Sequence, residues 1–182
     1  MNQKKMILAA FFAALLCISS YIIIPIGLVP HSMQIAFIFL TGLILGKKWA
    51  SISVLVWFMI GCLGLPVFAG GKAGITTFIG PTGGFLIGFL VSAYLIGFFS
   101  ERGLTKFKLT FIVFMLGLLV VYVLGTIGFV LSMKYVLNKP LAWDVAIKMV
   151  VIPFLPFDLI KAVMAAYIGL RVKRALAYIV PN

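Results

Sequence analysis

The stretch "MQIAFIFLTGLILGKKWASISVLVWFMIGCL", residues 33–63, decides the fold, because it is apolar over most of its length but carries two adjacent lysines near its middle. A single membrane helix over these residues would place Lys47 and Lys48 inside the hydrocarbon, at a cost of about 2.5–3.5 kcal/mol each. Two helices over residues 33–45 and 50–63, joined by a turn at "GKKW", avoid that cost. The sequence therefore predicts a helical hairpin with arms of only about 20 Å.

The rest of the chain has a similar composition, since 64% of its 182 residues are hydrophobic and 10% are charged. Soluble domains usually carry about 25% charged residues, and apolar runs of spanning length recur here. We predict an all-α integral membrane protein with six transmembrane helices, and with residues 1–182 forming a single domain. The other four helices are expected over residues 6–24, 83–100, 109–133 and 145–170, the last interrupted by Pro153 and Pro156.

The positive charge of the chain lies mostly in short loops between the apolar runs. This pattern sets membrane topology, and it argues against nucleic acid as the partner of a chain with net charge +12. Ten of the 15 basic residues fall on one side of the predicted helices: Lys4, Lys5, Lys47, Lys48, Arg102, Lys106, Lys108, Arg171, Lys173 and Arg174. We expect that side, and with it both termini, to be cytoplasmic.

The sequence offers little for catalysis or for a bound cofactor. It has one histidine, His31, three acidic residues, and no Ser-His-acid constellation. Cys17 and Cys62 lack metal-ligand spacing, and "GLILGKKW" lacks the glycine spacing and the Ser or Thr that a phosphate loop needs. We expect a protein that is not an enzyme and holds no metal or cofactor; an intramembrane enzyme would need a nucleophile–base pair.

An acidic and a basic residue interrupt the apolar segment "PFLPFDLIKAVMAA", residues 153–166. Asp158 and Lys161 are three apart, so they share one face of a helix. In one interpretation Asp158 caps a helix that begins after Pro156, and Lys161 neutralises it. In the other, which we favour, the pair offers an acceptor and a donor to a compact neutral ligand such as an amide or a cyclic urea, since charge inside a membrane is costly.

A glycine-rich segment, residues 64–84, holds seven glycines together with apolar side chains such as Phe68. Because long ordered loops often serve as lids, we expect this loop to fold over the helices and enclose the apolar part of a ligand. A structural re-entrant segment is the alternative. Within it, Thr82 is placed to cap the helix that follows.

Small residues recur at a spacing of four near the start of the chain, in Ala9 and Ala13 and again in Ala10 and Ala14. Such a strip allows another helix to pack closely. The spacing alone leaves open whether that helix belongs to the same bundle or to a partner subunit.

Four segments occur in order: "IPIGLVPHSMQ", "GCLGLPVFAGGKAG", "GPTGGFLIGF" and "PFLPFDLIKAVMAA". Together they resemble BioY, the biotin-binding S-component of energy-coupling factor (ECF) transporters. The resemblance implies a six-helix bundle in a bacterial inner membrane, with a biotin pocket near the outer surface. It implies that Asp158 and Lys161 bind the polar ring of biotin, that Gln34 fits the Pro-x-x-x-Gln pattern after the first helix, and that the loop contributes a polar contact, for which Thr77 is the candidate.

The resemblance also implies partners. The first helix would dock through Ala9 and Ala13 onto a transmembrane coupling subunit that carries two ATPase subunits, within membrane lipid. An S-component for another small vitamin and a membrane scaffold without a ligand are the alternative hypotheses.

Overall fold

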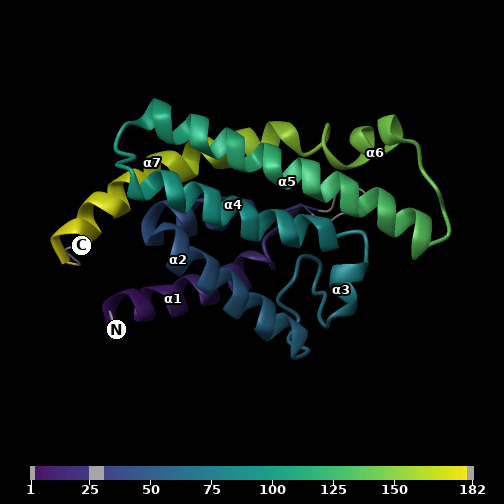
Figure 1. The fold of residues 1–182 in the computed structure, drawn as a ribbon, viewed down its shortest axis with the longest axis horizontal. Helices are drawn as coiled ribbons and strands as arrows, with labels where there is room; N and C mark the ends of the chain where they lie inside the picture. The colour runs from purple at the N-terminus through teal and green to yellow at the C-terminus, as the bar shows by residue number, and fades with distance from the viewer. Residues whose placement is uncertain (1–2, 25–30, 180–182) are drawn as a thin grey trace.

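The computed structural model describes residues 3–24 and 31–179, which form a helical bundle along one long axis (Figure 1). Two short strands, β1 (Ile23–Ile24) and β2 (His31–Ser32), pair antiparallel. The described residues otherwise form helices: α1 (Gln3–Ser19), α2 (Gln34–Cys62), α3 (Thr76–Ile79), α4 (Gly83–Glu101), α5 (Phe107–Tyr135), α6 (Trp143–Val150) and α7 (Leu155–Ile179). The predicted helical fold class is confirmed.

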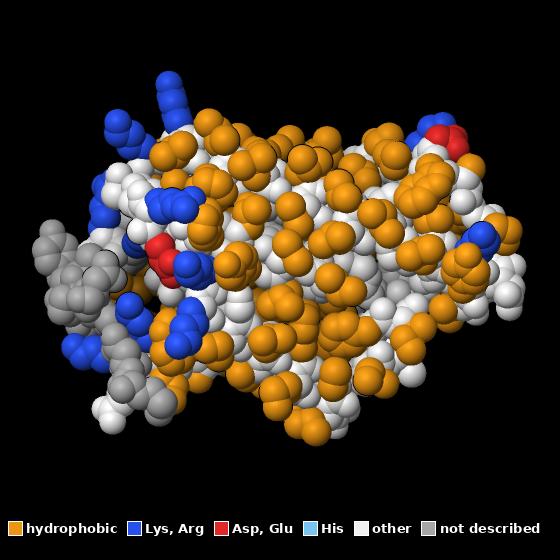
Figure 2. Space-filling view, in the orientation of Figure 1, with side chains coloured by type: hydrophobic (Ala, Val, Ile, Leu, Met, Phe, Trp, Pro, Cys, Tyr) orange, Lys and Arg blue, Asp and Glu red, His pale blue; other side chains and the backbone are white. Residues whose placement is uncertain are grey.

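Three helices, α2, α4 and α5, are long and apolar enough to cross a membrane. The pair α6 and α7, bent by 49° at their junction, makes a fourth candidate span. Figure 2 shows hydrophobic side chains over the middle of the face in view, and lysine and arginine gathered at its left-hand end. An exposed apolar surface of this extent is stable in the hydrocarbon of a bilayer, so the chain is a membrane protein.

The turn predicted within residues 46–49 is found at Gly46, where α2 is interrupted. Gly46 has φ 76° and ψ 172°, in a region that glycine adopts without steric cost. The backbone N–H of Lys47 donates to Glu101 Oε1 at 3.0 Å. A Cβ on Gly97 would lie 2.5 Å from the carbonyl carbon of Gly46, so a glycine in α4 allows the turn to pack against it.

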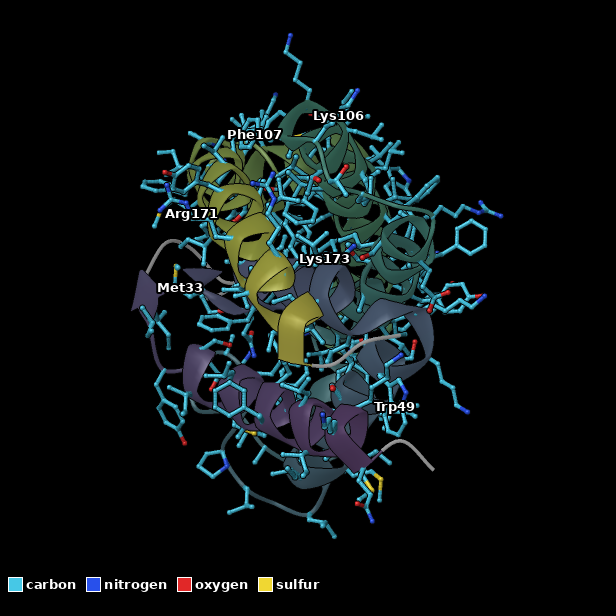
Figure 3. The ribbon with its side chains drawn as sticks, turned by 90° about the vertical axis from the view of Figure 1, so that its left-hand side faces the viewer. Met33, Trp49, Lys106, Phe107, Arg171 and Lys173 are labelled. Carbon is cyan, nitrogen blue, oxygen red and sulfur yellow. The ribbon has the colours of Figure 1, made fainter. Side chains whose placement is uncertain are left out.

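The chain termini lie at one end of the bundle (Figure 1), and lysine and arginine side chains gather at the same end (Figure 2). Figure 3 looks onto this end, with Lys106, Arg171 and Lys173 labelled. Lys173 Nζ donates to Ser100 Oγ at 2.6 Å and to the Ser100 carbonyl at 3.0 Å, which ties α7 to the last turn of α4. The basic residues that the sequence places on one side of the predicted helices therefore gather at one end of the molecule.

The glycine-rich loop folds back onto the helices, as predicted, and is held there by aromatic packing. The Trp57 indole N–H in α2 donates to the Val67 carbonyl at 2.9 Å. The ring centroids of Trp57 and Phe68 lie 5.4 Å apart, and Phe68 also contacts Phe78 edge to face at 5.7 Å. Phe68 is buried as a result, close above Gly61.

Candidate functional site

A cavity of about 60 Å³ lies where the glycine-rich loop meets the start of α2, the first half of α4, the middle of α5 and the start of α7. Most of its wall is apolar and includes Phe68, Phe85, Phe89 and Phe154. The polar side chains that line it are Ser32, Gln34, Thr82, Tyr122 and Asp158. A few convergent polar groups in an apolar wall are typical of small-molecule sites, although this cavity is smaller than most.

Asp158 is the acidic group of the cavity, and two side chains hold its carboxylate. The Tyr122 hydroxyl donates to Oδ2 at 2.7 Å, and Lys161 Nζ donates to Oδ1 at 3.2 Å. Asp158 and Lys161 are 4% and 5% exposed, so the ion pair is buried. A buried charge is tolerated only with partners of this kind.

Lys161 lies behind the cavity wall and links two elements of the site. Its ammonium donates to the Ser32 carbonyl at 2.7 Å as well as to Asp158. Ser32 belongs to β2, directly before α2. The lysine therefore fixes the start of α2 to the first turns of α7.

The local sequence explains why Asp158 lies where it does. Residues 151–154 form turns between α6 and α7, and Pro156 falls in the first turn of α7, where its missing N–H leaves no bond unmade. Asp158 lies in the same first turn, where the helix dipole stabilises a negative charge. The helix begins at Leu155, before Pro156, and the Asp158 N–H donates to the Phe154 carbonyl at 3.0 Å. Asp158 therefore lies inside the helix and not at its N-cap, so the expected capping role is wrong.

Two buried polar atoms of the cavity wall have no hydrogen-bond partner among the described residues: Gln34 Nε2 and Thr82 Oγ1. The Gln34 oxygen does accept a bond, from Ser32 Oγ at 2.9 Å. Thr82 is the N-cap residue of α4, as expected, but its side chain makes no cap hydrogen bond. Leaving a buried polar atom unpaired costs about 1–3 kcal/mol, so both side chains favour a polar group in the cavity.

The structure brings together most of the predicted site residues. Asp158, Gln34 and Phe68 line one cavity, and Lys161 contacts Asp158. Thr77 does not belong to this wall; its hydroxyl donates to the Ala73 carbonyl at 3.1 Å, within its own turn. Thr82 is the loop threonine that faces the cavity. The side chain of His31 lies outside the part of the chain that is described.

Sequence reasoning missed Tyr122, which lies in the middle of the apolar run that forms α5. A signal was available, because a tyrosine hydroxyl inside a membrane needs a hydrogen-bond partner. Its partner is an aspartate 36 residues away, and the spacing along the chain does not reveal such a contact.

The predicted docking strip on the first helix must be corrected. Ala9 and Ala13 are 3% and 1% exposed, and the Ser53 hydroxyl of α2 donates to the Ala9 carbonyl at 2.8 Å. These two alanines therefore pack α1 against α2 within the bundle. Ala10 and Ala14, on the next face of the helix, are exposed.

Fold and site together define a helical membrane protein that has a small cavity with a buried ion pair at its wall. Within residues 3–24 and 31–179, no three His, Cys, Asp or Glu side chains come together as metal ligands. The family model described as BioY family matches residues 1–178. The chain belongs to the BioY family.

Relatives match over nearly their whole length. A Thermotoga maritima protein named biotin transporter BioY is 40% identical over 172 residues, which cover 94% of this chain and 97% of the relative. The probable biotin transporter BioY of Pyrococcus horikoshii is 34% identical, with 95% and 98% covered. A crystal structure of the S-component for biotin from an ECF-type ABC transporter is similar with TM-score 0.81 and 32% identity, covering 94% of this chain and 91% of that one.

Proposed function

We propose that this chain captures biotin as the substrate-specific subunit of an ECF transporter in a bacterial inner membrane. The observation that carries the proposal is the buried pair of Asp158 and Lys161 at a mostly apolar cavity, in a chain of the BioY family. The names of the relatives, which are biotin transporters, support the choice of ligand. Binding and transport, and not catalysis, are the role we assign.

The ureido ring of biotin suits the polar side of the cavity. It carries two N–H donors and one carbonyl acceptor, and no charge. We assign the N–H groups to the Asp158 carboxylate and the carbonyl to the Lys161 ammonium, which would exchange its bond to the Ser32 carbonyl for the ligand. Gln34 Nε2 and Thr82 Oγ1, which are buried without partners in the described residues, supply further contacts. Thr82 takes the role that the sequence suggested for Thr77.

The apolar side of the cavity suits the rest of the ligand, but the cavity must widen to admit it. About 60 Å³ holds only a few water molecules, whereas typical ligand sites are several times larger. Phe68 lies in the loop and lines the cavity. We propose that this loop moves outward to admit biotin and closes with Phe68 against the bicyclic ring system and its tail.

The basic end of the bundle faces the cytoplasm in this proposal, with six spans and both termini inside. The lysine and arginine side chains gathered at that end (Figure 2) support this orientation. The cavity lies toward the opposite end, where the loop could open to the outside.

The partners we propose are a transmembrane coupling subunit and its two ATPase subunits. Support comes from the solved neighbour, which is an S-component of an ECF-type transporter. On α1, Ala10 and Ala14 are exposed, so a helix of the coupling subunit can pack closely against them. Ala9 and Ala13 are buried against α2 and are not accessible to a partner. Coupling at this strip would place the contact on the helix that packs against α2.

Calorimetric titration of the detergent-purified protein with a panel of vitamins tests the proposal. We expect saturable, one-to-one binding of biotin, weaker binding of desthiobiotin, and no heat from thiamine or riboflavin. Saturable binding of thiamine or riboflavin in place of biotin would assign the chain to another vitamin. If thermal unfolding shows that the purified protein is folded and it binds none of these vitamins, the result would support the scaffold hypothesis.

A further inference from the structure

A second hollow, of about 370 Å³, lies on the outside of the bundle between the start of α4 and the last turns of α5, next to α3. Figure 1 shows α4 and α5 running side by side in this region. A Cβ on Gly84 would lie 2.8 Å from the Cα of Gly128, so the two backbones touch within the groove. Its apolar walls include Ile87, Ile127 and Leu131, each more than a third exposed.

One polar atom in this apolar groove has no hydrogen-bond partner in the described part of the chain. Ser132 lines the groove, is 4% exposed, and its Oγ finds no partner among the described residues. Water, which would normally satisfy a hydroxyl, is absent from the hydrocarbon that bathes this face. The occupant of the groove must therefore bring an acceptor to the level of Ser132.

Positive charge flanks the same end of the groove. Ser132 lies one turn before the end of α5 at Tyr135, whose side chain also lines the groove. Lys134 Nζ lies 4.9 Å from the centroid of the Tyr135 ring. The backbone N–H of Lys139 donates to the Met133 carbonyl at 2.8 Å, so Lys139 lies next to the C-terminal end of α5. Both lysine side chains are exposed.

We propose that the groove is a binding site for one glycerophospholipid of the leaflet that meets the C-terminal end of α5. One acyl chain lies along Ile87, Ile127 and Leu131, Ser132 Oγ donates to an ester carbonyl, and Lys134 and Lys139 attract the phosphate. Along α5 the apolar wall comes first, then the Ser132 hydroxyl, then the lysines. A glycerophospholipid has its acyl chain, its ester and its phosphate in the same order. An apolar helix of a second protein copy would match the wall but would leave Ser132 unpaired.

Native mass spectrometry of the detergent-solubilised protein with added phosphatidylglycerol tests this proposal, with Ser132→Ala as the variant. Ser92→Ala is the matched control, because Ser92 Oγ is also buried without a partner in the described residues but lies outside the groove. An ether-linked phosphatidylglycerol, which lacks the ester carbonyls, is the matched ligand. Thermal unfolding of each variant checks that the protein remains folded.

We expect Ser132→Ala to weaken phosphatidylglycerol binding about 2- to 10-fold, which is the effect of one hydrogen bond. Ser92→Ala should bind as the unchanged protein does, and the ether lipid should bind the unchanged protein as weakly as the ester lipid binds Ser132→Ala. Equal binding of both lipids, or equal losses in both serine variants, would overturn the proposal. A stable dimer that excludes lipid and is weakened by Ile127→Trp would also overturn it, in favour of a second copy in the groove.

Discussion

Gly61 gives Phe68 the space it needs to close the cavity, which makes Gly61→Ala a sharp test of the lid. A Cβ at this position would lie 2.5 and 2.8 Å from Cε2 and Cε1 of Phe68, and closer still to Cζ. Carbon atoms in contact prefer separations of about 3.5–4.0 Å. Trp57 and Phe78 pack against the same ring, so the Phe68 side chain has no room to move away while the loop is closed.

The size of the effect follows from the cost of overpacking. Forcing one extra methyl group into a packed core costs about 1–3 kcal/mol. The free protein can avoid this cost by opening the loop, whereas the complex needs the loop closed. The cost therefore falls on the complex, and each 1.4 kcal/mol weakens binding tenfold. We expect the Kd for biotin to rise about 5- to 150-fold.

Calorimetric titration with biotin measures this effect, and Gly169→Ala is the control. A Cβ on Gly169 would lie 2.8 Å from a terminal methyl of Leu43 and 2.9 Å from one of Leu40, a milder conflict in α7, outside the cavity wall. We expect that variant to bind biotin within about twofold of the unchanged protein. Adding Phe68→Leu to Gly61→Ala should cost less than the sum of the single changes, because the two residues are in contact.

Two results would refute this reasoning. Gly61→Ala could bind biotin as tightly as the unchanged protein, in which case Phe68 does not close on the ligand. Gly169→Ala could lose as much affinity as Gly61→Ala, in which case the loss reflects general destabilisation of the bundle.

Three further substitutions probe the site and its support. Tyr122→Phe removes the donor to Asp158 Oδ2 and should weaken biotin binding about tenfold or more in calorimetry, since bonds to charged groups contribute about 1.5–3 kcal/mol; unchanged affinity would contradict this. Thr82→Val removes a buried hydroxyl that has no partner among the described residues. Thermal unfolding should therefore show an equal or higher Tm, while biotin binds about 2- to 10-fold more weakly. A lower Tm would argue against this. Lys173→Met removes the donor to Ser100 and should lower Tm with a Kd within about twofold; a loss of affinity as large as that of Tyr122→Phe would show that this end of the bundle shapes the site.

Local rules that act along the chain were enough to predict most of the helical segments and the interruption of α2 at Gly46. Lys47 and Lys48 cannot lie in hydrocarbon, and Gly46 beside them is the residue that tolerates the turn. The importance of Asp158 and Lys161 could be predicted for a related reason. A charged residue in an apolar membrane segment is costly, so it indicates a functional or pairing role.

Contacts between distant segments could not be predicted in the same way. The spacing of Ala9 and Ala13 is identical to that of Ala10 and Ala14, and only the position of α2 decides which pair is buried. The glycine-rich loop offers several threonines, and its path determines that Thr82 faces the cavity. No rule of spacing connects Tyr122 to its aspartate on another helix.

The role of the buried carboxylate is the central claim, and titration of Asp158→Asn with biotin tests it most directly. Asp144→Asn is the matched control, because Asp144 forms an exposed ion pair with Lys148 on α6. The proposed site predicts that Asp158→Asn binds biotin about 10- to 100-fold more weakly, while Asp144→Asn binds as the unchanged protein does. Equal affinity in all three proteins would contradict the assignment of Asp158 to the ligand.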